Sequence, residues 1–313
     1  MTFNIENFVI IGSCLSEADP TINKIQMTGF FTQIEDTDDI RQGDIIHKLN
    51  PRTGETETLG IVITADCDIA QRKAGERYTW LEILPMAAYL EGPWALEQLR
   101  KLSEKRSKGI CEQLNGQIRK LKPEIEALTH ESLVQWLRSK TAVDVLTSAT
   151  GIAPSADDKL LRDLQGFALT VSVDKTQSAF RRLKEAWTLF GVDEKKQQES
   201  VRTAFKDSGG FQDYFVLPEL PRQSGLGFVV MLRSMWTIMA SDLYFTEQDA
   251  RIHDRPDAYH RVGRLNDGIR FSITQKLAFL FSRIGMPTTF ESACETATEI
   301  TVEDFFKKNA QEA

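Results

Sequence analysis

The side chains best placed to do chemistry are Asp66, Cys67 and Asp68, which follow the apolar run Gly60-Ile61-Val62-Ile63-Thr64-Ala65. If that run is a strand, alternation puts both carboxylates on one face and the thiol on the other. Two such carboxylates could hold a hard cation such as Mg²⁺ or share one proton. With a base such as His47 beside it, the Cys67 thiol could act as a nucleophile. We therefore take Asp66, Cys67, Asp68 and His47 as candidate catalytic residues, with Asp66 and Asp68 as candidate metal ligands.

A structural role is the alternative for the same cluster. Asp66 and Asp68 could order a turn by accepting hydrogen bonds from backbone N–H groups, while Cys67 packs as a small apolar side chain. On this hypothesis no cofactor is expected, and a divalent metal such as Mg²⁺ belongs only to the catalytic alternative. Geometry separates the two: convergence of the carboxylates and His47 in an open pocket supports chemistry, and backbone amides on the carboxylates support the turn.

A second polar group contains His253 and His260 together with Asp249, Asp254 and Asp257. The two histidines are seven residues apart, which matches no common spacing of zinc ligands. The pattern predicts a solvated loop rather than a metal site.

Positive charge is concentrated over residues 97–122, where eight Lys and Arg residues stand against three Glu. A basic face on a helix could follow a phosphate backbone. The more general interpretation is a charged helix exterior, because the whole chain carries a net charge of −7. The candidate nucleic-acid-binding residues are Arg100, Lys101, Lys105, Arg106, Lys108, Arg119, Lys120 and Lys122.

The composition is that of an ordinary globular protein. The chain has 313 residues, of which 41% are hydrophobic and 27% charged. It contains no apolar run long enough to span a membrane, and its first residues lack the pattern of a signal peptide, so we expect a soluble cytoplasmic protein without membrane contact. The four cysteines, at positions 14, 67, 111 and 294, are far apart and are expected to be free thiols.

The hydrophobic pattern changes period along the chain. Apolar, β-prone runs predict strands at 8–12, 29–32, 43–49, 59–64, 78–85, 214–218 and 225–239, and alternation suggests another at 167–173. Between 93 and 210 most of the pattern is helical, including a near-heptad stripe from Ile110 to Leu128 that is suited to helix packing. A final helix is predicted from Asn266 to about residue 284, followed by a polar tail.

These elements predict an α+β fold. The expected architecture is a small SH3-like β-barrel split by a large, mainly helical insertion, plus a C-terminal helix that packs on the barrel, because neither group of strands suffices alone. The predicted division is 1–92 for the first part of the barrel, 93–210 for the insertion, 211–265 for the second part of the barrel, and 266–313 for the C-terminal helix and tail. A separate C-terminal β domain is the alternative.

Two of the predicted strands resemble a known family. Gly43-Asp44-Ile45-Ile46 followed by Gly60-Ile61-Val62-Ile63-Thr64 is similar to the opening of MazF/PemK-like barrels, a family made up largely of small endoribonuclease toxins. The resemblance, over residues 43–64, implies a toxin-like SH3-like barrel. The Arg-Pro pair that precedes the second strand in that family is replaced by Thr58-Leu59, and no active-site residue of the family carries over to this chain.

Three functions are compatible with the sequence. The leading hypothesis is a non-enzymatic interaction or regulatory protein that binds a partner protein through the stripe or the barrel, because the chain has many amphipathic helices and no complete catalytic constellation. The alternative is a metal- or thiol-dependent hydrolase, such as a MazF/PemK-like ribonuclease, centred on Asp66, Cys67 and Asp68. The third is nucleic-acid binding by the basic 97–122 face. A homo-oligomer is compatible with each.

Overall fold

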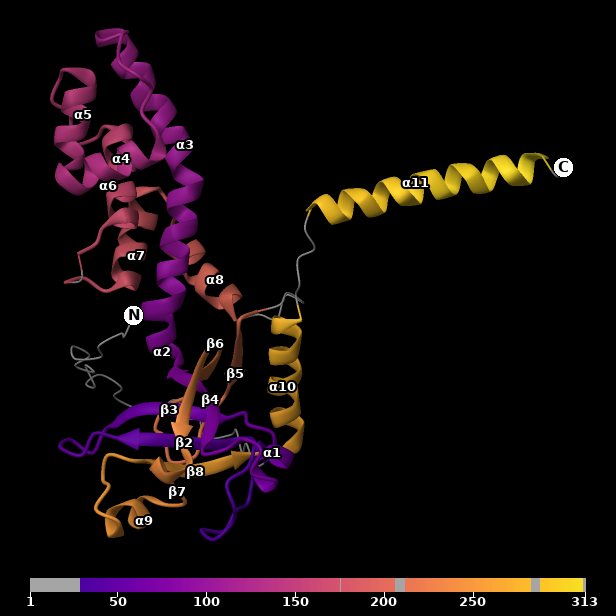
Figure 1. Ribbon diagram of the computed structural model, residues 1–313. Coiled ribbons are helices and arrows are strands. Elements are labelled where there is room, and N and C mark those ends of the chain that lie inside the picture. The colour runs from indigo at the N-terminus through magenta and orange to yellow at the C-terminus, as the bar shows by residue number, and fades with distance from the viewer. Residues whose placement is uncertain (1–28, 175, 206–211, 283–287, 312–313) are drawn as a thin grey trace.

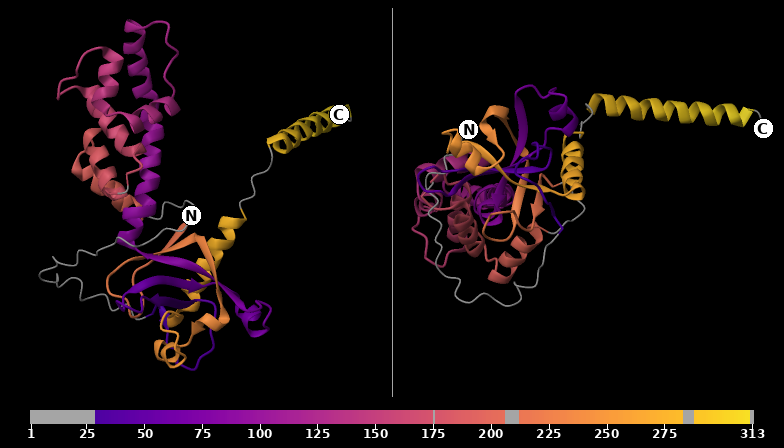
Figure 2. Two further views of the ribbon diagram at one scale, coloured as in Figure 1. Left: turned by 60° about the vertical axis from the view of Figure 1, so that its left-hand side comes forward. Right: turned by 90° about the horizontal axis from the view of Figure 1, so that it is seen from below.

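The computed structural model describes residues 29–174, 176–205, 212–282 and 288–311 (Figure 1). The predicted strand at 8–12 and the cysteine at position 14 lie outside the described residues. Within them the protein is a mixture of helix and sheet, with a curled sheet on one side and an elongated group of helices on the other (Figure 2).

A single sheet gathers strands from both halves of the chain. Its order is β1-β8-β2-β3-β4-β6-β5, with antiparallel neighbours, and β7 pairs in parallel with β8 off this path. The sheet curls, so that side chains from β2 and β5 reach the same core. The strand bounds are β1 Phe31–Thr32, β2 Asp44–Leu49, β3 Thr56–Val62, β4 Arg77–Pro85, β5 Tyr214–Leu217, β6 Phe228–Met239, β7 Leu243–Tyr244 and β8 Tyr259–Leu265.

One face of the sheet is covered by the helix α10 (Asp267–Phe281). Asn266 caps its N-terminus by accepting a hydrogen bond from the Ile269 N–H, as the sequence predicts. Ile273 and Leu280 of α10 are buried against residues of six strands, including Ile61 of β3. The predicted packing of the C-terminal helix on the sheet is therefore confirmed.

The opposite face of the sheet is organised by a glycine. A Cβ at Gly60 of β3 would lie 2.3 Å from the ring of Trp80 on the neighbouring β4, so only glycine leaves room for this ring against the sheet. Trp80 in turn stacks on Trp236 of β6 and contacts Tyr259 of β8. The aromatic side chains thus cover the middle of this face.

All helices between β4 and β5 belong to the elongated group. Their bounds are α2 Met86–Tyr89, a π-helical turn Leu90–Trp94, α3 Ala95–Leu121, α4 His130–Ser139, α5 Ala142–Thr150, α6 Lys159–Val171, α7 Ala179–Leu189 and α8 Glu194–Ala204. A core of apolar side chains joins α3 to α4, α5 and α6, with Leu114, Leu164 and Phe167 fully buried. A second core, containing Trp94, Leu99 and Leu183, includes Val229 of β6 and so connects the helices to the sheet.

Three elements differ from the predictions. Residues 167–173 do not form a strand, because Leu161, Leu164 and Phe167 at helical spacing bury one side of α6, and Asp158 caps that helix. The polar tail is the helix α11 (Thr288–Gln311), which extends away from the rest of the molecule in Figure 1. The region around His260 is the strand β8 and not a loop.

Two short elements follow β6, a 3₁₀ turn at Ala240–Asp242 and the helix α9 (Glu247–Ile252). In the described part of the chain, none of the helices combines the length and the apolar character that crossing a membrane requires.

Candidate functional site

The Asp66-Cys67-Asp68 cluster lies in a helix rather than at the end of a strand. β3 ends at Val62, and the three residues form the first turn of α1 (Asp66–Ala70). Successive helical residues are about 100° apart, so the carboxylates of Asp66 and Asp68 point to different sides. The predicted arrangement of both carboxylates on one face is therefore wrong, because the strand alternation does not continue to Asp66.

Both oxygens of the Asp66 carboxylate are occupied. Oδ1 accepts a hydrogen bond from the backbone N–H of Gln42 at 2.8 Å, and Oδ2 pairs with Arg270 of α10 at 2.5 Å. Arg270 also contacts Asp267 at 2.9 Å. Asp66 thus ties α1 to the turn before β2 and to the start of α10. Asp66 therefore has a structural role, as in the turn hypothesis. The backbone N–H that it binds belongs to Gln42, before β2, and not to the turn after β3.

Cys67 is exposed, and its Sγ lies 3.6 Å from Asp68 Oδ1. The structure places His47 with other partners. No group of three or more His, Cys, Asp or Glu side chains within the described residues could hold a metal ion.

His47 instead belongs to a hydrogen-bonded chain inside the sheet. Thr56 Oγ1 donates to Gln223 Oε1 at 3.2 Å, and Gln223 Nε2 lies 3.2 Å from His47 Nδ1. His47 Nε2 lies 2.5 Å from His260 Nε2, and His260 bonds to the backbone of Ala258. Because the amide nitrogen only donates, His47 Nδ1 must accept, and His47 then donates through Nε2 to His260. Each donor in this chain meets an acceptor when both rings are neutral.

Burial keeps these two imidazoles uncharged. His47 is 7% exposed and His260 3% exposed. Burial, and then the charge of His260, lowers the pKa of His47 to about 4. Burial also lowers the pKa of His260, and the nearby Glu247 partly opposes this. The pair joins the adjacent strands β2 and β8, where His47 and His260 are direct cross-strand partners.

A buried ion cluster lies at the start of the same two strands. Asp44 is fully buried, with Arg264 Nε 2.6 Å from Oδ1 and Arg261 3.7 Å from Oδ2. The backbone N–H of Arg41 also donates to Oδ2 at 2.8 Å. Burial raises the pKa of Asp44, while the hydrogen bond and charge of Arg264 act in the opposite direction. All of these neighbours are N–H donors, so the arrangement is satisfied when Asp44 is an ionised carboxylate that only accepts hydrogen bonds.

The two arginines extend this cluster into the loop before β2. Arg261 donates to the backbone carbonyls of Glu35 and Asp38 at 2.9 and 2.7 Å, and Arg264 donates to that of Asp39 at 2.6 Å. The loop is therefore held by side chains more than two hundred residues later in the chain. Sequence reasoning did not single out either arginine and placed His260 in a solvated loop, although Val262 and Leu265 of the same strand offered an apolar signal.

The predicted polar group around His253 is divided by the fold. His253 ends α9 in an exposed position, with Nδ1 3.3 Å from Asp249 Oδ1. His260 is buried in β8 and faces His47. The two histidines therefore form no common site.

The basic residues of 97–122 lie on and just after α3. Arg100 pairs with Glu97 at 2.7 Å and with Glu104 at 2.5 Å, and Lys101 pairs with Glu97 at 3.5 Å. The guanidinium of Arg106 lies over the ring of Phe190, 4.6 Å from its centre. These contacts neutralise or cover part of the predicted face. Lys105, Lys108, Arg119, Lys120 and Lys122 are exposed.

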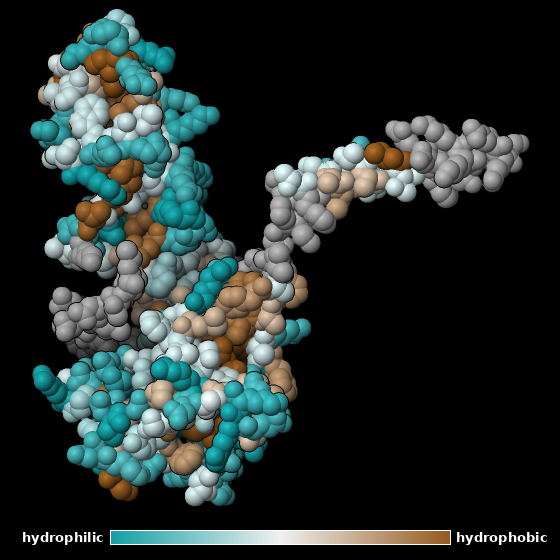
Figure 3. Space-filling model, viewed as in Figure 1, coloured by the Kyte–Doolittle hydropathy of each residue, from teal (hydrophilic) through white to brown (hydrophobic). Residues whose placement is uncertain are grey.

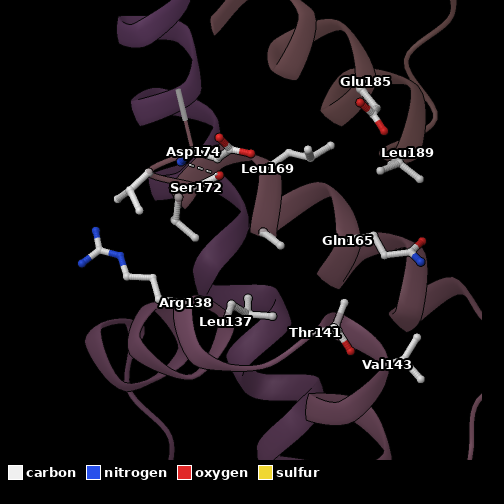
Figure 4. A pocket seen from close by; sticks show the side chains of 14 residues that line it. Leu137, Arg138, Thr141, Val143, Gln165, Leu169, Ser172, Asp174, Glu185 and Leu189 are labelled. Atoms are coloured by element: carbon white, nitrogen blue, oxygen red, sulfur yellow. Dashed lines mark hydrogen bonds between the residues drawn. The ribbon is translucent and has the colours of Figure 1, made fainter. Parts of the chain in front are cut away.

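A hollow of about 700 Å³ lies between α4, α5, α6 and α7 (Figure 4). Its walls include Leu137, Leu169 and Leu189, and several of its polar side chains have other partners. Thr141 and Asp144 form a capping box at the start of α5, and Asp174 and Glu185 bond to Thr176 and Gln177. The labelled polar groups in Figure 4 are spread around the rim and do not converge on one point.

Comparison of the chain with models of known protein families, with curated proteins and with solved structures finds no match. The geometry around Asp66 and His47 gives both residues structural roles. It assigns Asp66 to holding α1, α10 and the turn before β2 together, and it assigns His47 to the interior of the sheet.

Proposed function

We propose that this chain is a non-enzymatic interaction protein that binds a partner protein through the outward face of α10. The observation that carries the proposal is the exposure of large aromatic side chains on a helix whose other face is already buried. Phe271 is 55% exposed and Phe281 53% exposed, and Phe279 between them is 49% exposed.

Helical geometry explains why these side chains cannot reach the core. At about 100° per residue, Ile269, Ile273, Leu277 and Leu280 fall within about 80° of one another, and these four pack on the sheet. By the same count Phe271 and Phe279 lie about 160° and 120° from the middle of this arc, on the opposite side of the helix, and Phe281 lies about 80° from it, beside the buried face at the end of the helix. An amphipathic surface helix normally presents polar residues there.

The exposed face is more than a scatter of single apolar residues. Figure 3 shows a continuous hydrophobic area over α10, in contrast to the mostly hydrophilic surface around it. Contiguous apolar patches on a folded protein mark interaction sites. Aromatic side chains are also the residues that contribute most to binding energy in protein interfaces.

The alternatives have less support. Ile110 and Leu114 of the near-heptad stripe are buried in the chain's own helical core, so only its far end, where Leu121 and Ile125 are exposed, offers surface to a partner. Both carboxylate oxygens of Asp66 already have a protein partner, and Asp68 points to another side of α1, which weakens the support for a hydrolase. The ion pairs of Arg100 and Lys101 reduce the charge available for a phosphate backbone.

We also infer that the curled sheet is an SH3-like barrel related in geometry to MazF/PemK-like toxins, and that the helices between Pro85 and Tyr214 are an insertion into it. The support is that β4 and β6 are neighbours in the sheet although the whole helical group separates them in the chain. On this hypothesis the barrel serves as a platform for α10.

The test replaces the exposed aromatic residues and measures what binds. Tagged full-length chain, expressed in its native cells, is purified as wild type, as Phe271→Ser/Phe281→Ser and as Ile152→Ser, and co-purified proteins are quantified by mass spectrometry. Ile152 is 73% exposed on the helical group and is the matched control. We expect a partner to fall at least about tenfold with the double variant, since losing anchor residues costs about 2 kcal/mol each.

Two further results decide the outcome. The melting temperatures of all three proteins should agree closely, because the replaced side chains are exposed. Asp66→Asn should retain the partner if no chemistry at Asp66 is involved. Equal partner levels in wild type and double variant would exclude the α10 face as the binding surface.

A further inference from the structure

The second half of β6 forms an open edge of the sheet. β5 pairs with Phe228–Met231 only, and the last bond on this side runs from the Leu232 N–H to the Asp213 carbonyl. On the other side, β4 continues to pair with β6 from Met235 to Met239. In the described ranges no strand pairs with β6 on this side beyond Asp213.

Exposure along the strand agrees with an open edge. Met235 is 44% exposed, Trp236 is 48% exposed, and Thr237 is also exposed. Consecutive residues of a strand point to opposite faces of the sheet. Three exposed residues in a row therefore mean that side chains on both faces of the sheet are accessible here.

This edge lacks the usual protection against strand pairing. Exposed edges normally carry lysine, proline or another charge that prevents a second strand from adding. The segment Ser234-Met235-Trp236-Thr237-Ile238-Met239 contains no charged residue and no proline, although 27% of the chain is charged. Arg233, just before it, is paired with Asp213 at 2.6 Å.

We infer that this segment pairs antiparallel with the same segment of a second copy of the chain, about a two-fold axis near Trp236. Free N–H and C=O groups in a row require an extended backbone as their partner. In a two-fold arrangement the same segment lies on both sides, so an uncharged segment meets no like charge. Elsewhere two copies that each carry a net charge of −7 repel one another.

The ends of the segment are complementary in this arrangement. Antiparallel pairing brings the Arg233 end of one copy beside the Met239 end of the other. That end continues into Asp242, which is paired with Arg255 at 2.9 Å. With the axis near Trp236, Arg233 of one copy lies level with Met239 of the other, and the Asp242–Arg255 pair follows three residues beyond that point. Trp236, already stacked on Trp80, lies near the axis as an aromatic anchor.

The test uses charge at Thr237, whose side chain is exposed next to the proposed axis. Mass in solution is measured by light scattering for the full chain at low and high concentration, and for Thr237→Lys, Thr237→Glu and an equal mixture of the two. We expect the wild type to reach the mass of two chains, each variant alone to remain at one chain, and the mixture to return to two. Val173→Lys, at a 72% exposed residue of the helical group, should behave as wild type.

The outcomes separate this inference from the proposed partner binding. Phe271→Ser/Phe281→Ser should still dimerise, because α10 does not contribute to the strand pairing. Amide hydrogen exchange at 234–239 should slow in the wild type as concentration rises. A wild type that stays at one chain at every concentration overturns the inference, and so does a Thr237→Lys variant that remains a dimer.

Discussion

The sheet and the helical group differ in the kind of side chain that they bury. β2 and β8 bury Asp44, His47, His260, Arg261 and Arg264 between them, and each finds its partner across the sheet. The core of α3, α4, α5 and α6 is made of apolar side chains, and most of its polar groups lie outside it as helix caps and surface ion pairs.

The difference has an energetic meaning. Trimming a buried apolar side chain lowers the free energy of unfolding in proportion to the atoms removed. Removing one partner of a buried ion pair costs several kcal/mol at once. The sheet should therefore be fragile to single polar substitutions and to acid, and the core of α3, α4, α5 and α6 should respond weakly to changes in the polar residues around it. Three measurements test this contrast.

The largest effect is expected from Asp44→Asn. The change leaves the guanidinium groups of Arg261 and Arg264 buried without a countercharge, and we expect the free energy of unfolding to fall by about 3–5 kcal/mol. Urea unfolding followed by tryptophan fluorescence measures it. Asp36→Asn makes the same chemical change on an exposed residue of the preceding loop and should leave stability within about 0.5 kcal/mol. If Asp44→Asn lowered the free energy of unfolding by less than about 1 kcal/mol, the sheet would be no more sensitive to a polar substitution than the helical group.

An intermediate effect is expected from pH. Since the pKa of His47 is lowered to about 4 in the folded protein, the unfolded chain binds this proton first, at its ordinary pKa of about 6.5. Stability is then constant above pH 6.5 and falls between pH 6.5 and about 4, by on the order of 3 kcal/mol for His47 alone. The lowered pKa of His260 acts in the same direction.

Unfolding curves at a series of pH values check this slope, and hydrogen exchange shows where it acts. Protection should decrease first in β2 and β8 and later in α3–α6. His47→Gln removes one titrating group and should make the acid slope shallower. An unchanged slope in His47→Gln would assign the acid sensitivity to other residues.

The smallest effect is expected from Asp158→Ala in the helical group. The Asp158 side chain accepts hydrogen bonds from the N–H groups of Leu160 and Leu161 at the start of α6. Removing an N-cap costs about 1 kcal/mol. Asp157→Ala, at the neighbouring exposed residue, should have almost no effect, and thermal unfolding of both variants measures the difference. A loss from Asp158→Ala as large as that from Asp44→Asn would break the comparison.

The same contrast explains which elements could be predicted. The helices from 93 onward and the strands β3, β4 and β6 follow the hydrophobic period, because most of their buried side chains are apolar. β2 was predictable from Ile45 and Ile46, although it also buries Asp44 and His47. The sequence pattern does not predict β8, because its polar residues are of the kind usual in loops. In the fold these residues are buried in the strand Tyr259-His260-Arg261-Val262-Gly263-Arg264-Leu265. Their partners, such as Asp44, lie far away in the sequence, and a local pattern contains no information about them.

The candidate site was predictable only in part. The position of Asp66-Cys67-Asp68 just after a strand could be recognised, but the partners of Asp66 in the helix that follows are Gln42 and Arg270, which lie far away in the sequence. The separation of His47 from this cluster depends on the pairing of β2 with β8. Both are consequences of tertiary contacts between distant segments, which spacing along the chain does not reveal.

The helix α3 sets a distance as well as a shape. Its 27 residues run without a break from the core that includes Val229 of β6 to the core around Leu114, a length of about 40 Å. Each residue added to or removed from its middle would shift the far helices by about 1.5 Å and turn them by about 100° around the axis. The number of residues in α3 therefore fixes both how far from the sheet α4, α5 and α6 are held and which way they face.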